Sequence, residues 1–568
     1  MKSAGLTHPP SVEAARVVVG TLLAQGVRDV VIAPGSRSAP FVPVLAAAEA
    51  GGALRVRVVL DERSAAFMAL GMARAYGGTR RPAVVITTSG TAVANLHPAV
   101  AEADAAGVPL LVVSADRPHE FVGTGASQTT EQTRLFGAAA RLVVDLPADL
   151  LADLGSTAGA AAIAGQVRRL VAAARGTFSD DPGPAQLNIR FRPPLTAAEG
   201  VPVGPSPGRL EALAPLPGPQ LPTTARPVQA VARRGLIVAG DGPDEAGPVT
   251  RALAEHLRWP LLAEPTSGAR GGPMALTRYA ELLATPAGQE LAGQAEHILV
   301  AGHPSLSRPV TALLARTDIP VEVLATTARW TDVAGNAARV LPLPRDPGQV
   351  PELVGILGLD PIGSDWVGGW RRAVAALAPL PVPGEKLTAA EVVLAAYRSS
   401  VEPEGPGPRL VVASSMTIRY LDRFAPPAVG PGPGVVANRG LAGIDGTLAT
   451  AVGLSLASGE PTRVVLGDLA FLHDAMSLAR GSLETEPDLQ AVVVDDRGGA
   501  IFSTLEYPQL MAAEVFDRYF TAPQATDIPR LARALGAHVH EPRSRSDLHA
   551  ILSRPPRGLS VVHVRVHP

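Results

Sequence analysis

Acidic residues follow two short runs near the C-terminal end of the chain. Asp468 stands in Gly467-Asp468-Leu469, directly after the run 463–466, and Asp495-Asp496 follows the apolar run 491–494. A strand that ends in Gly-Asp can present a carboxylate at its tip, and a second strand end can complete the shell around a divalent cation. Mg²⁺ takes hard oxygen ligands and commonly bridges protein carboxylates to a diphosphate. The pattern therefore predicts a site for a metal and a diphosphate at these strand ends.

The same spacing is typical of thiamine diphosphate sites, whose usual pattern is Gly-Asp-Gly followed by Asn-Asn. This chain carries a degenerate version, and both acids could instead cap the helices that follow their strands. Gly240-Asp241-Gly242, after the run 235–239, is a closer literal match. At the corresponding distance downstream, however, Ala269-Arg270-Gly271 supplies no anionic or amide ligand. We therefore interpret 240–242 as a turn.

Glu62 lies far upstream, at the entry to an apolar helix within Leu60–Phe67. An acid in a first helical turn can simply favour the helix dipole. A thiamine enzyme, however, needs one carboxyl group in an apolar setting against the aminopyrimidine ring. There the carboxyl shares a proton with the ring nitrogen and promotes the imino tautomer, which can take the proton from the thiazolium C2. Glu62 is the candidate for that role.

Arginines follow strand candidates at four places: Arg37, Arg117, Arg419 and Arg439. Any one of them alone is more typical of a surface ion pair than of a ligand contact. Four together, in a chain whose formal net charge is −2, favour a polyanionic substrate. Arginine suits that task because its planar guanidinium binds carboxylates bidentately.

Bulk properties limit the classes of function. The length of 568 residues suggests about three domains, and 46% apolar with 18% charged residues is typical of a globular protein. The formal charge removes any bulk attraction to nucleic acid or anionic membrane. The chain has no cysteine, which excludes disulfides, thiolate nucleophiles and zinc–sulfur sites. The apolar runs are too short to cross a membrane, and no secretion signal is recognisable, so we expect a cytoplasmic enzyme.

Short Val/Ile/Leu runs alternate with Ala-rich amphipathic stretches along the whole chain. This alternation predicts an α/β fold of three doubly wound parallel-sheet domains. The strand candidates of the first third are 30–33, 56–60, 83–87, 110–114 and 142–145. Those of the second third are 235–239, 260–263, 298–301, 321–325 and 340–343. Those of the last third are 410–413, 435–437, 463–466, 491–494 and 559–566.

Two proline-rich stretches without helix or strand periodicity, 201–227 and 376–383, are predicted to be linkers. We therefore expect domains at 1–200, 201–383 and 384–568. In such sheets ligands bind beyond the carboxyl ends of the strands, and the polar strand ends cluster in the first and last domains. The middle domain is poorer in them, which suggests a largely architectural role.

Taken together, these segments resemble the 2-succinyl-5-enolpyruvyl-6-hydroxy-3-cyclohexene-1-carboxylate synthase family, the thiamine-dependent enzymes of menaquinone biosynthesis. The N-terminal motifs that carry the resemblance are Ala33–Ser38, Asp61–Arg63, Thr88–Asn95 and Ser114–Pro118. The C-terminal ones are Asn438–Gly440, Gly443–Gly446, Gly467–Leu469, Gly498-Gly499 and Ile501-Phe502. They occur in the family's order, and both linkers fall at its domain junctions.

The resemblance implies a pyrimidine-binding N-terminal domain, a central domain and a C-terminal domain that binds diphosphate and metal. It implies active sites between subunits, hence a homodimer or a dimer of dimers. Glu62 would activate the cofactor, and Mg²⁺ or Mn²⁺ would be held by Asp468, Asp496 and the Gly498 carbonyl. Further cofactor contacts would come from Ser415, Ile444, Gly467, Asp468, Leu469, Ile501 and Phe502. Substrate carboxylates and hydroxyls would be bound by Ser36, Arg37, Arg117, Gln128, Arg419 and Arg439.

The implied reaction is the decarboxylation of 2-oxoglutarate, followed by 1,4-addition of the resulting succinic semialdehyde–thiamine carbanion to isochorismate. Its products are CO₂ and 2-succinyl-5-enolpyruvyl-6-hydroxy-3-cyclohexene-1-carboxylate. Both substrates are polycarboxylates, as the four arginines require. Two departures from the family stand out. Many relatives carry Asn where this chain has Asp496, and Ser307-Arg308 stands where some carry two cationic residues.

Two rival interpretations remain open on the residues alone. Another thiamine-dependent 2-oxoacid decarboxylase or carboligase, similar to acetohydroxyacid synthase, would share the cofactor motifs but does not call for this density of arginines. A non-catalytic nucleotide- or anion-binding protein could use the same folds, because a fold alone does not define a function. Glu62 separates a thiamine-dependent enzyme from such a binding protein, since a protein that only binds diphosphate has no use for that acid.

Overall fold

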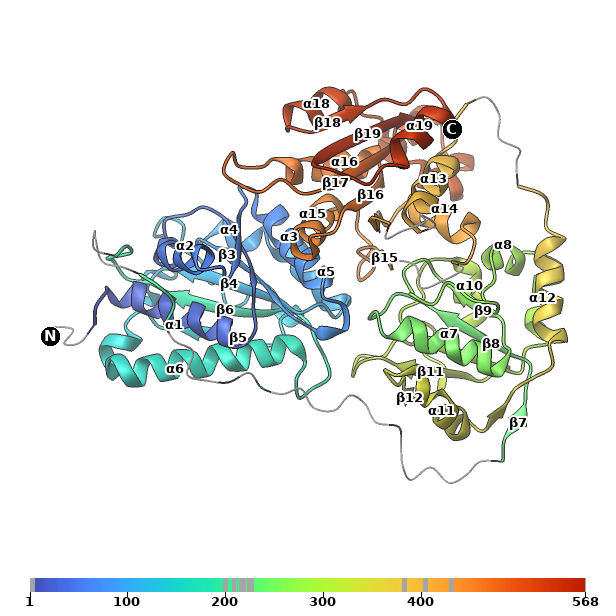
Figure 1. Cartoon of the computed structure of the whole chain (residues 1–568), viewed down its shortest axis with the longest axis horizontal. Helices are drawn as coiled ribbons and strands as arrows, with labels where there is room; N and C mark the ends of the chain where they lie inside the picture. The colour runs from blue at the N-terminus through green and yellow to red at the C-terminus, as the bar shows by residue number, and fades with distance from the viewer. Residues whose placement is uncertain are drawn as a thin grey trace. The chain divides into compact units, whose positions relative to one another are not determined.

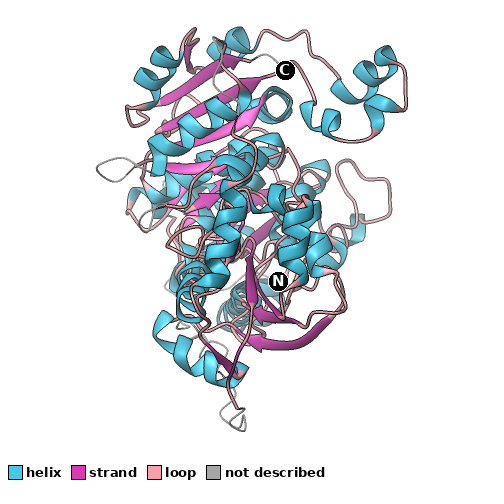
Figure 2. Cartoon of the chain, turned by 90° about the vertical axis from the view of Figure 1, so that its right-hand side faces the viewer, coloured by secondary structure: helices cyan, strands magenta, loops and turns pink. Residues whose placement is uncertain are grey.

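The computed structural model describes residues 6–197, 203–206, 211, 213, 221, 229–380, 386–401, 407–428 and 434–566. Three separate parallel sheets dominate these residues, and helices flank the strands (Figure 2). Every pairing between named strands is parallel. None of the described helices is both long and apolar enough to cross a membrane. The α/β class of parallel sheets predicted from the alternating pattern is confirmed.

The first sheet comprises six strands, in the order β2 (Arg55–Val58), β1 (Asp29–Ile32), β3 (Ala83–Thr87), β4 (Leu110–Asp116), β6 (Ala185–Arg190) and β5 (Val143–Leu146). One face shares an apolar core with α1 (Pro10–Ala24), α2 (Val42–Ala50) and α6 (Leu150–Arg175) (Figure 1). On the other face lie α3 (Glu62–Arg74), the short α4 (Thr91–Ala94) and α5 (His97–Ala105). The central strands are buried throughout because helices cover both faces.

The second sheet has the order β12 (Ala337–Pro342), β11 (Val321–Ala325), β10 (His297–Ala301), β8 (Gly235–Ala239) and β9 (Leu261–Ala263). Two helices share a core with one face, α7 (Ala246–Leu257) and α11 (Val350–Leu357). Four helices share the core of the other, α8 (Tyr279–Leu283), α9 (Pro286–Gly293), α10 (Arg308–Leu314) and α12 (Asp365–Ala375). A separate two-residue pairing joins β7 (Val231–Ala232) to β13 (Leu359–Asp360).

The third sheet has the order β15 (Val435–Val436), β14 (Arg409–Val412), β16 (Thr462–Gly467), β17 (Leu489–Asp495), β19 (Leu559–Arg565) and β18 (His538–His540). Its core is shared with α13 (Ala389–Val401), α14 (Met416–Phe424) and α19 (Arg545–Leu552). The remaining helices of this part of the chain are α15 (Thr447–Ser458), α16 (Asp468–Asp474), α17 (Ala513–Phe516) and α18 (Ile528–Ala534).

Each sheet has a point at which its strand order reverses, and ligands of such sheets bind outside the strand ends at that point. In the first sheet it lies between β1 and β3, and in the third between β14 and β16. Ser36 and Ser89 follow the first pair, whereas Ser415 and Asp468 follow the second. The topology therefore brings several of the predicted site residues to the two crevices.

By contacts between residues, the chain divides into two compact units. Unit 1 comprises 1–216, 440–459 and 474–487, and unit 2 comprises 217–439, 460–473 and 488–568. The three-domain boundaries at 1–200, 201–383 and 384–568 stay a prediction. Of the first predicted linker, residues 203–206 lie against α1, where Ser206 donates its N–H to the Arg16 carbonyl at 3.1 Å. Most of that linker, and 381–383 of the second, lie outside the described residues.

All fifteen predicted strands coincide with strands of the structure to within a few residues. Four strands were not predicted: β6, β7, β13 and β18. Three of them are only two or three residues long. The omission of β6 matters more, because this strand lies between β4 and β5 and carries polar side chains into the interior of unit 1.

Candidate active site

Arg37 lies beyond β1, where two other segments of unit 1 hold it. Its backbone N–H donates to the Thr88 hydroxyl at 3.2 Å, and its Nη1 donates to the Phe191 carbonyl at 2.9 Å. Gly35 permits this approach, since a Cβ there would lie 2.3 Å from Cβ of Thr88. Burial lowers the pKa of Arg37, and the nearby charge of Arg117 lowers it further.

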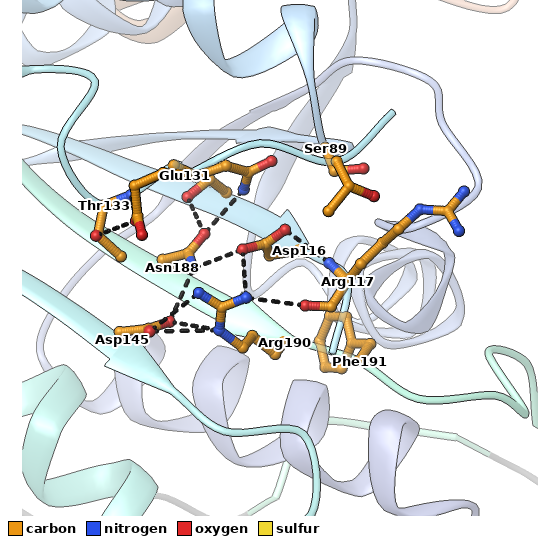
Figure 3. Close-up of polar contacts among 12 residues, drawn as sticks. Ser89, Asp116, Arg117, Glu131, Thr133, Asp145, Asn188, Arg190 and Phe191 are labelled. Atoms are coloured by element: carbon orange, nitrogen blue, oxygen red, sulfur yellow. Dashed lines mark hydrogen bonds and ion pairs between the residues drawn. The ribbon is translucent and has the colours of Figure 1, made fainter. Parts of the chain in front are cut away.

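Arg117 follows β4 and is fixed through its backbone. Its N–H donates to Asp116 Oδ1 at 2.7 Å, and its carbonyl accepts from Arg190 Nη1 at 3.1 Å. Asp116 is fully buried and is also contacted by Asn188 and Arg190, so it is occupied by partners other than the Arg117 side chain. That side chain points away from Asp116 and Arg190 (Figure 3). Its buried Nε has no hydrogen-bond partner among the described residues. An anion could supply that partner.

Gln128 lies against Ser89 in a reciprocal pair of hydrogen bonds. The Ser89 hydroxyl donates to the Gln128 carbonyl at 2.8 Å, and Gln128 Nε2 donates to the Ser89 carbonyl at 3.1 Å. Gln128 has a φ of 56°, which places a non-glycine residue in the left-handed region. Ser36, Arg37, Arg117 and Gln128 all belong to unit 1, and hydrogen bonds tie Arg37 to Thr88 and Gln128 to the adjacent Ser89.

Glu62 is the first residue of α3, and the preceding Asp61 caps the helix by accepting from the Ser64 N–H at 3.0 Å. Glu62 itself has one long contact, 3.5 Å from Asn95 Nδ2 to its Oε2. Its carboxylate is half-buried and is not used as the cap. The position at the start of the helix leaves a carboxylate oxygen available to a ligand.

The helix that carries Glu62 packs unusually closely on α15. A Cβ at Gly71 would lie 2.0 Å from the Thr450 carbonyl oxygen, and a Cβ at Gly453 would lie 2.0 Å from that of Met68. Backbone therefore contacts backbone at this crossing. Ile444, the predicted cofactor contact, precedes α15 in the same unit and is partly exposed.

Asp468 directly follows β16 and Asp496 directly follows β17, and these are neighbouring strands of the third sheet. Burial raises the pKa of Asp468 to about 7, with Asp496 and Asp495 contributing by repulsion. Burial and the charge of Asp495 raise the pKa of Asp496 to about 6. The adjacent Asp495 is engaged internally, because its Oδ2 lies 2.8 Å from Nε2 of the buried His563. Asp468 and Asp496 are thus the two carboxylates left for a cation.

Gly498, the third predicted metal ligand, has a constrained backbone. Its φ of 139° favours glycine, and a Cβ there would lie 2.2 Å from the Thr521 carbonyl oxygen. Its own carbonyl accepts from the Ala500 N–H at 3.0 Å, which leaves the second lone pair available. Two carboxylates and a carbonyl are hard oxygen donors that fit Mg²⁺ and leave positions for diphosphate oxygens. No cluster of three or more His, Cys, Asp or Glu able to hold a metal occurs among the described residues.

Ser415, Gly467, Leu469, Ile501 and Phe502 are the other predicted cofactor residues of unit 2. Gly467 ends β16, and the Leu469 N–H donates to Asp468 Oδ1 at 2.8 Å. Ser415 is the N-cap residue of α14, at the switch point of the third sheet. Ile501 and Phe502 lie in the short helix 500–504, where the Phe502 ring packs edge-on against Phe520, 5.3 Å between centroids.

Arg419 and Arg439, the other two arginines predicted to bind substrate, belong to unit 2. Arg419 Nη1 donates to the Ser415 carbonyl at 3.0 Å, and Arg439 Nη2 donates to the Ser305 hydroxyl at 2.9 Å. Burial lowers the pKa of Arg419, and the charge of Arg439 lowers it further. Arg439 is buried, and its Nε has no hydrogen-bond partner within the described ranges.

In the second sheet the strand order reverses between β10 and β8, and the loops that follow these two strands pack against each other there. The turn 240–242 and the loop after β10 pair there, with the His303 N–H donating to the Asp241 carbonyl at 2.7 Å. A Cβ at Gly240 would lie 2.1 Å from the His303 carbonyl carbon. This close packing supports the interpretation of 240–242 as a structural turn. The side chain of Arg308 is 80% exposed, and its Nη1 lies 4.0 Å from Glu506 Oε2.

Three parallel α/β sheets, carboxylates that follow two neighbouring strands and a half-buried acid at a helix start are the features expected of a thiamine diphosphate-dependent enzyme. In agreement, residues 12–135 match the family described as "Thiamine pyrophosphate enzyme, N-terminal TPP binding domain". Curated relatives named 2-succinyl-5-enolpyruvyl-6-hydroxy-3-cyclohexene-1-carboxylate synthase extend the match to nearly the full length. The one from Kineococcus radiotolerans is 45% identical, with 98% of this chain and 96% of the relative covered.

Two further relatives of the same name agree. The protein of Paenarthrobacter aurescens is 41% identical over 98% of this chain and 94% of its own, and that of Leifsonia xyli subsp. xyli is 39% identical over 98% and 97%. The chain therefore belongs to the 2-succinyl-5-enolpyruvyl-6-hydroxy-3-cyclohexene-1-carboxylate synthase family. The resemblance inferred from the motifs is confirmed.

Several residues that shape the site carry no signal in the sequence. Ser89 lies in the motif Thr88–Asn95 and is assigned no role from the sequence, yet it holds Gln128. The carbonyl of Phe191 holds Arg37, and Arg190 holds Arg117, both from the end of the unpredicted strand β6. A backbone carbonyl is available at every residue, so only the fold could identify the one that acts.

Proposed function

We propose that this chain decarboxylates 2-oxoglutarate and adds the remaining four-carbon unit to isochorismate by 1,4-addition. The products are CO₂ and 2-succinyl-5-enolpyruvyl-6-hydroxy-3-cyclohexene-1-carboxylate, on the route to menaquinone. Thiamine diphosphate supplies the carbon nucleophile and the electron sink for the loss of CO₂. Mg²⁺ or Mn²⁺ anchors its diphosphate. Membership of the family supports the activity, and the geometry supports the choice of residues.

The observation that supports the substrate class is a buried guanidinium nitrogen without a hydrogen-bond partner among the described residues. Arg117 Nε supplies it in unit 1, and Arg439 Nε supplies it in unit 2. An anion would give each nitrogen a partner, and carboxylates fit the planar guanidinium bidentately. 2-Oxoglutarate and isochorismate each carry two carboxylates.

The chain's own residues supply proton exchange, metal binding and the contacts to cofactor and substrate. Glu62 holds the proton that it exchanges with the ring nitrogen of the cofactor. Asp468, Asp496 and the Gly498 carbonyl hold the metal. Cofactor contacts come from Ser415, Ile444, Gly467, Leu469, Ile501 and Phe502, and Ser36 and Gln128 donate to substrate oxygens beside the arginines.

We also propose that the enzyme is a homodimer or a dimer of dimers, with active sites between subunits, and that it is cytoplasmic. Residues 1–200 would bind the pyrimidine, 201–383 would form a central domain, and 384–568 would bind diphosphate and metal.

One assay tests the proposal: purified enzyme with 2-oxoglutarate and isochorismate, with and without thiamine diphosphate and Mg²⁺, followed by mass spectrometry of the products. We expect the carboxylated cyclohexene product only when all four components are present. Pyruvate in place of 2-oxoglutarate serves as the control for an enzyme similar to acetohydroxyacid synthase. Carboligation of pyruvate without use of isochorismate would replace the proposal by that alternative.

A further inference from the structure

A buried network of polar side chains lies behind Arg117 and Gln128 in unit 1. Figure 3 shows its centre, where dashed lines join Asn188 and Arg190 to Asp116 and Asp145. Asn188, on β6, is fully buried and uses both ends of its amide. Its Nδ2 donates to Asp116 at 3.0 Å and to Asp145 at 2.8 Å, whereas its Oδ1 accepts from Ser114 and Gln132. Two carboxylates on one side and two donors on the other fix the orientation of this amide.

Gln132 carries the network to the loop that contains Gln128. It is fully buried; its Nε2 donates to Asn188 Oδ1 at 2.9 Å, and its Oε1 accepts from the Gly90 N–H at 2.9 Å. Gly90 has a φ of 84° and directly follows Ser89, the residue paired with Gln128. The amide of Gln132 therefore ties both sides of the Ser89–Gln128 contact to the centre of the sheet.

The network explains how Gln128 is held in an unfavourable backbone conformation. Gln128 is held in the left-handed backbone region, which a non-glycine residue occupies only when its surroundings impose it. The reciprocal pair with Ser89 imposes it locally, and Gln132, four residues further along, holds the returning end of the loop. Gln128 itself is exposed, so its remaining capacity to donate faces outward.

We infer that Gln132 and Asn188 are positioning residues, which hold Gln128 in its binding conformation through the Gly90 N–H and the loop backbone. The inference rests on the proposed function, since Gln128 is there a substrate-binding residue. Neither side chain touches the substrate. Their effect is on affinity for substrate, through Gln128, and not on the cofactor, whose contacts lie elsewhere.

The decisive variant is Gln132→Glu, which keeps the shape of the side chain. One carboxylate oxygen still accepts from Gly90, but the other faces the Asn188 oxygen, and two acceptors cannot bond. We expect a rise of about three- to tenfold in the KM that Gln128→Ala also raises, the factor carried by one neutral hydrogen bond or slightly more. The thiamine diphosphate concentration for half-maximal activity should stay unchanged.

A double variant separates positioning from general damage. If Gln132 acts only through Gln128, then Gln132→Glu in a Gln128→Ala background should raise KM no further, because coupled residues are not additive. Thr129→Ala is the matched control: it lies in the same loop, and its hydroxyl donates to the Ser127 carbonyl, outside the network. It should keep the parent's KM values.

The possible outcomes distinguish a failure of this inference from a failure of the proposed function. An active parent whose Gln132→Glu variant keeps its KM, or whose double variant shows fully additive losses, overturns the inference alone. An inactive parent overturns the proposed function, and the inference with it. If Gln132→Glu does not fold, Ser89→Ala removes the hydroxyl bond to Gln128 from the other side. That variant should raise the same KM about threefold, and an unchanged KM would likewise overturn the inference.

Discussion

The carboxylate of Glu102 accepts the backbone N–H of Gly440 at 2.8 Å, across a separation of 338 residues, and that of Leu441 at 2.7 Å. Glu102 is on α5 and is 3% exposed. A Cβ at Gly440 would lie 2.8 Å from the Glu102 carbonyl oxygen and from the Ala106 nitrogen. The acid and the glycine of the Asn-Arg-Gly motif therefore require each other. The loop that they anchor leads to Ile444.

Glu102→Gln should weaken the binding of thiamine diphosphate. The amide can accept only one of the two N–H groups, and its NH₂ faces the other, which leaves a buried donor unpaired at a cost of about 1–3 kcal/mol. The displaced loop carries Ile444 with it. The apparent Kd from a fluorescence titration with Mg²⁺ present should rise several-fold. Asp104→Asn, on the same helix but paired with Arg141, is the control, and an equal Kd in both variants would contradict the prediction.

Glu62→Gln should keep the fold and most cofactor affinity and lose nearly all turnover. The amide cannot exchange a proton with the ring nitrogen, and acid–base catalysis contributes typically ~10²–10⁴-fold. Steady-state kcat with saturating cofactor is the measurement. Asp61→Asn is the neighbouring control, because Asn caps a helix about as well as Asp. If Asp61→Asn loses as much activity as Glu62→Gln, the special role of Glu62 is wrong.

Asp468→Ala should abolish metal-dependent binding of thiamine diphosphate, since one of the two carboxylates facing the cation is removed. Calorimetric titration with and without Mg²⁺ measures this directly. Asp241→Ala provides the comparison, because Asp241 belongs to the Gly-Asp-Gly turn that pairs with His303. A larger loss of cofactor affinity in the Asp241 variant would reverse the choice between the two motifs.

Arg117→Ala and Arg439→Ala should each raise the KM for 2-oxoglutarate or isochorismate and leave cofactor affinity nearly unchanged. A charge-assisted hydrogen bond contributes roughly 1.5–3 kcal/mol, or about one to two decades in kcat/KM. Lysine should rescue only part of the loss, because it lacks the planar fork. Arg192→Ala is the control, an exposed arginine paired with Glu120 and Asp149. Unchanged kinetics in both site variants would show that the arginines do not bind substrate.

Glu264→Gln should change how stability depends on pH. Glu264 is 2% exposed, and burial raises its pKa to about 8 from an ordinary value of 4.5, with repulsion by Asp422 adding to the rise. The folded state thus binds the proton more tightly than the unfolded state. The stabilisation is complete below about pH 4.5 and is lost as the pH rises through about 8. The difference in Tm between parent and variant should therefore fall between pH 5 and 9. A constant difference would show that Glu264 does not titrate in this range.

The strands were predictable because parallel sheets bury continuous apolar runs, and the runs before Gly35, Asp468 and Asp496 are of this kind. Strand β6 was not, because its sequence alternates Leu187 and Ile189 with Gln186, Asn188 and Arg190. These polar side chains are buried and form hydrogen bonds with residues 114–145. Their burial depends on partners that are distant in the sequence.

The residues of the candidate site likewise include some that the sequence could identify and others that it could not. The types and spacing of Glu62, Asp468, Asp496 and the arginines indicate a chemistry, because few other roles need those groups at strand ends. The residues that orient them are a serine, a glutamine, a carbonyl and a glutamate on a helix, which are common everywhere. Their function follows only from distance, as between Ser89 and Gln128.

The close crossing of α3 and α15 has a consequence for how the chain is made. α3 ends at Arg74 and α15 begins at Thr447, so α3 leaves the ribosome long before its partner exists. At synthesis rates of ~5–20 residues per second, the wait is roughly 20–75 seconds. Throughout that interval the face of α3 around Gly71 lacks the α15 backbone at Thr450, which covers it in the finished protein. The helix that presents Glu62 can therefore reach its final packing only near the end of translation, and a gene truncated after the first sheet would encode a protein that never completes it.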